Sequence, residues 1–132
     1  MPEVSAVDPF DLPEWLGEGE VTWTAISGVA GASQVTGTLH GAEGLQGADD
    51  PLPCDLLAAD VAYPEPVVDQ EWRRAAHQQW SHGQVLLTSH DGRLTLVVPG
   101  TAFTADLALE CLARLARAVG AKPARFVAAL RL

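Results

Sequence analysis

The segment from Asp69 to Val119 constrains the fold most, because residues that begin or end an element stand at nearly every boundary within it. Asp69 suits a helix N-cap, since its carboxylate can accept the unpaired amide hydrogens of a first turn. One apolar face then recurs at helical spacing, at Trp72, Ala75, Ala76 and Trp80. Gly83 suits a left-handed helix end. The pattern predicts a helix over residues 69–82.

An Asp-Gly pair between two β-rich runs predicts a tight hairpin. Residues 84–89 and 93–98 flank Asp91 and Gly92, and a type I′ turn needs positive φ at both central residues. The alternation of side chains then defines two faces. The more apolar face carries Val85, Leu87, Ser89, Leu94, Leu96 and Val98. The mixed face carries Leu86, Thr88, His90, Arg93, Thr95 and Val97. We expect the mixed face to be partly exposed or to meet another chain.

A second helix is predicted after Pro99 and Gly100, with Thr101 or Thr104 as its cap. Its buried stripe recurs at helical spacing, at Ala108, Cys111, Leu112, Leu115 and Val119. Glu110 and Arg114 are spaced for an i,i+4 ion pair, and Gly120 ends the helix.

The first half of the chain predicts three strands and little helix. Residues 20–27 and 34–40 alternate as strands, and 54–63 form a third after a loop over 41–53. Residues 125–132 are compatible with a strand or a short helix. We therefore predict an α+β fold, with an antiparallel sheet and two main helices on one face. The expected order is β-β-β-α-β-β-α plus the undecided C-terminal segment.

Residues 1–19 are predicted to form a proline-rich arm outside a single α+β domain over residues 20–132. Four large apolar side chains would anchor the arm, namely Phe10, Leu12, Trp15 and Leu16. They can cover the domain's own core or insert into a partner. We expect the first, because exposed apolar groups of this size reduce solubility.

The composition excludes several classes of function. Hydrophobic residues make up 48% of the chain, which argues against general disorder, and the net charge of −9 opposes nucleic-acid binding. No apolar run is long enough to span a membrane, and Glu3 and Asp8 stand where a signal peptide would be basic. We expect a cytoplasmic protein. Its arginine, alanine and glycine content is typical of a high-GC bacterial source.

No catalytic motif is recognisable. His77 and His82 lie five residues apart, so they would project from different sides of a helix, and Cys54 and Cys111 form no metal or redox motif. Asp55 next to Cys54 would raise the pKa of that thiol. We therefore expect no cofactor and no metal, and lean against an enzyme.

The order of elements resembles the type III secretion chaperone-like fold, as found in the YbjN-like family of bacterial sensory-transduction regulators. The resemblance covers Cys54 to Val119: a strand, an acidic cap, a helix, the hairpin in SHDGRLTLVVP and the helix after Thr104. It implies a non-catalytic protein that holds a partner. The chain also looks like uncharacterised actinobacterial proteins, which implies no activity.

Our leading hypothesis is a non-catalytic protein-interaction or regulatory module, a homodimer that uses its sheet face or its arm. The candidate contact residues are Arg73, Arg74 and His77 on the first helix, and Leu86, Thr88, Thr95 and Val97 on the mixed hairpin face. The three cationic residues can instead pair with the protein's own carboxylates. The alternative is a small-molecule-binding domain or minor enzyme, with a pocket near Trp23, Trp72 and Trp80.

Overall fold

The computed structural model describes residues 4–42, 44, 50–59 and 70–132. The predicted cap Asp69, residues 43 and 45–49 of the predicted loop over 41–53, and the end of the predicted strand over 54–63 lie outside these residues.

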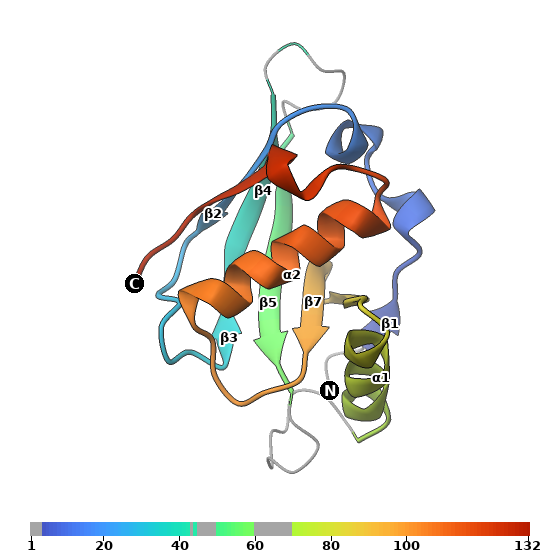
Figure 1. Ribbon diagram of the computed structural model, residues 1–132, viewed down its shortest axis with the longest axis vertical. Helices are drawn as coiled ribbons and strands as arrows, with labels where there is room; N and C mark the ends of the chain where they lie inside the picture. The colour runs from blue at the N-terminus through green and yellow to red at the C-terminus, as the bar shows by residue number, and fades with distance from the viewer. Residues whose placement is uncertain (1–3, 43, 45–49, 60–69) are drawn as a thin grey trace.

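In the described residues, eight strands form one mixed sheet that two helices cover (Figure 1). The strands are β1 (Val4–Ala6), β2 (Val21–Ala25), β3 (Gln34–Val35), β4 (Gly37–Gly41), β5 (Leu52–Ala58), β6 (Leu86–His90), β7 (Arg93–Val98) and β8 (Phe126–Ala129). The helices are α1 (Gln70–Ser81) and α2 (Ala105–Ala118), with short 3-10 turns η1 (Pro9–Asp11), η2 (Glu14–Gly17) and η3 (Pro123–Arg125). The strand order is β1-β6-β7-β5-β4-β2-β8, and β3 also pairs with β5.

The hairpin of β6 and β7 confirms the Asp-Gly prediction. Asp91 and Gly92 have φ values of 54° and 73°, as a type I′ turn requires. Leu87 lies opposite Leu96 and Thr88 opposite Thr95, so the two faces have the predicted members. Local turn chemistry was sufficient to set this register.

The α+β class is confirmed, but the sheet is not purely antiparallel. β5 runs parallel to β7, and β2 runs parallel to β8. Both pairs are joined by long connections: α1 and β6 lie between β5 and β7, and most of the chain lies between β2 and β8. Parallel neighbours need such crossovers, and local sequence does not show which distant strand a crossover reaches. The undecided C-terminal segment is thus an edge strand.

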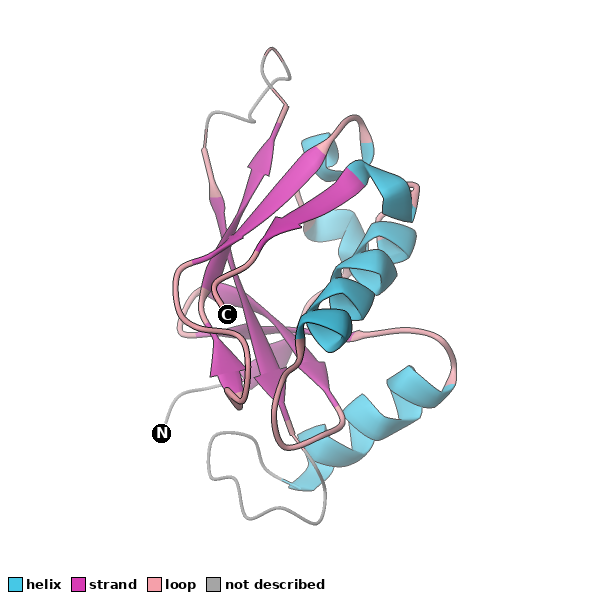
Figure 2. Cartoon of the chain, turned by 60° about the vertical axis from the view of Figure 1, so that its left-hand side comes forward, coloured by secondary structure: helices cyan, strands magenta, loops and turns pink. Residues whose placement is uncertain are grey.

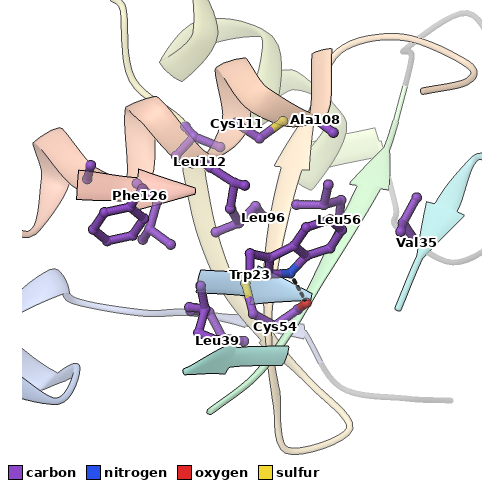
Figure 3. Close-up of a cluster of buried hydrophobic side chains, with 14 of the residues drawn as sticks. Trp23, Val35, Leu39, Cys54, Leu56, Leu96, Ala108, Cys111, Leu112 and Phe126 are labelled. Atoms are coloured by element: carbon purple, nitrogen blue, oxygen red, sulfur yellow. Dashed lines mark hydrogen bonds between the residues drawn. The ribbon is translucent and has the colours of Figure 1, made fainter. Parts of the chain in front are cut away.

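The main core lies between the sheet and α2, which crosses in front of β5 and β7 (Figure 1). Thr104 caps α2, and its predicted stripe is buried at Ala108, Cys111, Leu112 and Leu115. Figure 3 shows Ala108, Cys111 and Leu112 of α2 above side chains of the central strands, which include Trp23. The indole Nε1 of Trp23 donates a 2.9 Å hydrogen bond to the carbonyl oxygen of Cys54.

The two helices do not cover the same sheet positions, which differs from the prediction of one shared face. A smaller apolar cluster joins Ala76 of α1 to Leu57, Leu86 and Val97. These strand positions alternate with Leu56, Leu87 and Leu96, which belong to the main core under α2. α1 therefore covers part of the mixed hairpin face, where Leu86 and Val97 pack against its apolar side chains. Figure 2 shows α1 below α2, at the end of the sheet.

The arm is joined to the sheet. β1 pairs with β6 in antiparallel register, and Trp15 and Leu16 are buried in the main core, as self-packing predicts. Leu12 packs against the same core. Phe10 is the exception, since its side chain is 94% exposed. The prediction that Phe10 anchors the arm to this chain is therefore wrong.

An ion pair between the buried Asp55 and the half-buried Arg93 links three strands at Gly37. The predicted strand over 34–40 is interrupted at Thr36, between β3 and β4. The amide of Gly37 donates to Asp55 Oδ1 at 3.3 Å, and Gly37 oxygen accepts from Arg93 Nη2 at 3.1 Å. Arg93 also donates to both oxygens of the Asp55 carboxylate. Its Nε donates to Oδ2 at 2.8 Å and its Nη2 to Oδ1 at 2.9 Å. This hydrogen bonding raises the pKa of the Arg93 guanidinium, so Arg93 stays protonated.

Gly37→Ala should destabilise the fold by about 3 kcal/mol, because overpacking a dense core forces neighbouring groups apart. A Cβ at Gly37 would clash with the indole of Trp23. Urea denaturation measures the change in the free energy of unfolding. Gly28→Ala is the matched control, since its Cβ would stay 3.9 Å from the nearest atom and should change stability by less than about 0.5 kcal/mol. Equal effects of both substitutions would contradict this packing.

Asp55→Ala should cost about 3 kcal/mol, because it removes the acceptor from both the Arg93 guanidinium and the Gly37 amide. Glu110→Ala is the matched control: Glu110 pairs with Arg114 at 3.0 Å on α2, but its side chain is 44% exposed. That loss should stay below about 1 kcal/mol. The same urea series measures both. A smaller loss for Asp55→Ala than for Glu110→Ala would show that the Asp55–Arg93 pair does not join the strands.

Candidate functional site

A cleft of about 500 Å³ lies between the arm, β6 and the ends of both helices. We call it the arm–α2 cleft. Its lining is Ala6, Val7, Pro9, Gln79, Gln84, Val85, Leu86, Leu87, Arg114, Arg117 and Ala118. In Figure 1 the arm, which includes β1, runs beside α1 and the C-terminal end of α2. The volume is that of ordinary ligand sites. The lining combines apolar side chains with amides and two cations.

Arg114 forms part of the wall of this cleft, and several contacts hold its side chain in place. Its guanidinium lies 3.4 Å from the centre of the Trp80 ring, and its Nε donates to Glu110 Oε1 at 3.0 Å. Its Nη1 donates to the carbonyl oxygens of Trp80 and Gln84, at 2.8 and 3.0 Å. The side chain therefore satisfies carbonyls at the end of α1 and ties that end to α2.

Arg117 lies one turn further along the same helix and differs in its contacts. Its side chain is exposed, and it makes no ion pair with the residues that the structure describes. The C-terminal end of a helix also favours a cation there. Arg117 thus supplies an available positive charge at the rim of the cleft, in a chain whose net charge is −9.

A second hollow, of about 360 Å³, adjoins the first. Pro9 lines both hollows, and the second also includes Phe10, Glu14 and Val119. The amide of Phe10 donates to Asp8 Oδ1 at 2.9 Å, which caps the η1 turn. Pro9 occupies the first turn of η1 and restricts its backbone. Phe10 is therefore held outward by an ordered turn between the two hollows.

The hairpin residues predicted to bind a partner are enclosed within this chain. Leu86, Thr88, Thr95 and Val97 are all buried. Leu86 and Val97 pack in the cluster with α1, and the Thr88 hydroxyl donates to the Thr95 carbonyl at 3.0 Å. Only Leu86 also lines the cleft. The mixed face is therefore not an open contact surface.

The predicted cationic group on α1 lies apart from the lining of the arm–α2 cleft. Arg73 and His77 are half-buried and each already has an interaction partner, whereas Arg74 is exposed. α1 reaches the cleft through Gln79 instead.

The three tryptophans predicted to line a pocket do not come together. Trp23 is buried in the main core beside β5. Trp72 lies on α1 and packs against the smaller apolar cluster. Trp80 packs against the main core beneath Arg114. None of the three lines either hollow.

The cysteines and histidines form no cluster of metal ligands: within the described residues, no group of three or more His, Cys, Asp or Glu side chains is placed to hold a metal ion. Cys54 and Cys111 are both buried free thiols. Burial raises the pKa of Cys111 to about 12. Burial and then the Asp55 carboxylate raise the pKa of Cys54, in agreement with the expected effect of Asp55.

Two features of the sequence are compatible with the arm–α2 cleft but did not enter the prediction. Phe10 stands between Asp8 and Asp11 in a proline-rich turn, which is an unusual setting for a core residue. Arg114 and Arg117 are spaced to follow one side of a helix. Only the tertiary structure brings the arm against that side.

Comparison with known proteins finds no family model, no curated protein and no solved structure that matches the chain. The resemblance to the YbjN-like family and the chaperone-like fold stays a prediction. No helix in the described part of the chain is long and apolar enough to cross a membrane.

Both thiols should be unreactive in the folded protein. Thiolate is the reactive form, and burial keeps Cys111 protonated up to a pH near its pKa of about 12. A chromogenic disulfide reagent at mildly alkaline pH should therefore detect no thiol in the native chain, and both after unfolding in urea. Rapid reaction of the native protein would contradict the enclosed core between α2 and β5.

Proposed function

We propose that this protein is a non-catalytic binding module that holds a segment of a protein partner in the arm–α2 cleft. The segment would carry a carboxylate next to a large apolar side chain. The observation that carries the proposal is the position of Arg117, an available cation at the rim of a cleft whose floor is apolar.

The lining supports recognition of a polypeptide. Val7, Val85 and Leu87 offer apolar contact, and burial of an apolar side chain against them is favourable. Gln79 and Gln84 bring amides that can bond to main-chain groups of a bound segment. Arg117 can receive a carboxylate, which arginine binds through two parallel hydrogen bonds.

Binding is favoured over catalysis by the chemistry of the lining. The cleft contains arginine, glutamine and apolar residues, and its described lining includes no serine, cysteine, histidine or carboxylate. A nucleophile and an adjacent base, which covalent catalysis needs, are therefore not provided by these side chains. The proposal keeps the expected cytoplasmic location and bacterial origin, and it agrees with the partner-holding role that the chaperone-like resemblance implies.

A displayed library of random peptides, selected against the intact wild-type chain, tests the function. We expect the selected peptides to combine acidic and aromatic or aliphatic residues. Arg117→Glu should weaken their binding about tenfold or more, because it reverses the charge that meets the carboxylate. Fluorescence anisotropy of the labelled peptides measures the dissociation constants.

Arg125→Glu is the matched control, since Arg125 is also exposed but lies outside the cleft lining. Its charge change is identical, so it reports the effect of net charge alone. Peptides that bind both variants equally, or a library that yields no binder, would overturn the proposed function.

A further inference from the structure

We infer that the partner is a second copy of this chain, and that Phe10 of each copy enters the arm–α2 cleft of the other. This inference rests on the proposed function and names the segment that the cleft holds. The segment is the η1 turn with the acidic residues on either side of Phe10.

Phe10 has the properties of a group that projects into a partner. Its side chain is 94% exposed, although phenylalanine usually contributes a large buried area. The exposure does not come from a loose end of chain. The Asp8 cap and Pro9 hold the turn, and Trp15 and Leu16 fix the following residues in the core. Because the backbone of the turn is already fixed, it loses little conformational freedom on binding.

The cleft that would receive Phe10 opens beside it. Pro9 lines the cleft and directly precedes Phe10, so the projecting ring and the receiving surface belong to one side of the molecule. Val7, Val85 and Leu87 give the receiving surface apolar side chains. The cleft volume of about 500 Å³ exceeds the space that one aromatic side chain requires.

The charges of the two surfaces are complementary. Asp8 and Asp11 stand on either side of Phe10, and both are exposed. The cleft presents Arg117 at its rim and Arg114 in its wall. Two copies that each carry a net charge of −9 repel one another in general, so local opposite charges are needed for association. Each copy would contribute both an acidic turn and a basic rim.

A projecting group and its receptor on one side of the same chain suit a two-fold interface. In such an interface the same patch is used by both copies, so each contact occurs twice. The pairing then closes at a dimer, with both Phe10 side chains buried. The exposed Ile26, Val127 and Leu132 lie outside this patch and play no part in it.

Sedimentation velocity of the intact chain over a range of concentrations tests the inference. Wild type should form a dimer, and Phe10→Ala should weaken it about tenfold or more, because it removes the central apolar contact. The exposed Phe10 makes no core contact, so the variant should keep the wild-type circular dichroism and urea midpoint. Ile26→Ala is the matched control, since Ile26 is 54% exposed on another surface and should leave the dimer unchanged.

Charge and contact are tested separately. Arg117→Glu should weaken the dimer while Arg125→Glu should not. In a mixture of isotope-labelled and unlabelled copies, we expect nuclear Overhauser effects between the Phe10 ring of one copy and the methyl groups of Val7 and Leu87 of the other. Contacts of Phe10 with any different surface would overturn the inference.

The outcomes distinguish this inference from the proposed function. A wild-type chain that stays monomeric at every concentration, but binds acidic and apolar peptides through Arg117, would overturn self-association and leave the function standing. A dimer that Phe10→Ala does not weaken would overturn the inference as well. A dimer that the selected peptides dissociate, and that Phe10→Ala weakens, would support both.

Discussion

The Asp55 carboxylate adds side-chain hydrogen bonds between β4, β5 and β7 at a gap in the strand pairing. Pairing with β5 runs over Gln34 and Val35 and resumes in the same register at Thr38 and Leu39, so Gly37 lies in the gap. Asp55 accepts from the Gly37 amide and Arg93 donates to the Gly37 carbonyl, so the Asp55–Arg93 ion pair supplies hydrogen bonds at this point. A buried charge is stable only when it is paired and hydrogen-bonded, and here both conditions are met by groups from β4 and β7.

The same glycine determines how the core is built on the other side of the sheet. Because Gly37 has no side chain, the Trp23 indole can lie over β4 and donate to the carbonyl of Cys54. The ring then belongs to the surface on which α2 packs, together with Leu112 (Figure 3). The position of α2 in turn places Arg114 and Arg117 beside the arm. The cleft therefore depends on a contact in the centre of the sheet.

The sequence was sufficient where structure depends on neighbouring residues. Positive φ at Asp91 and Gly92 sets the hairpin, and the Thr104 cap and apolar stripe set α2. It was insufficient where distant segments meet: the parallel pairing of β8 with β2 depends on how the chain returns after α2. Phe10 shows the same limit for the site, because its apolar character indicated burial, whereas the η1 turn directs it outward.

The two arginines of the cleft have different roles, one in the fold and one in the proposed recognition. Arg114 uses three hydrogen bonds and the Trp80 ring to join α1 to α2, so it is held in place before any ligand arrives. Arg117, one turn later, has no such bonds with the described residues and can change its partner at little cost. A preorganised wall would lower the entropy lost on the proposed binding, and an available cation at its rim can receive a carboxylate. In this arrangement, the contact that stabilises the fold also shapes the proposed binding surface.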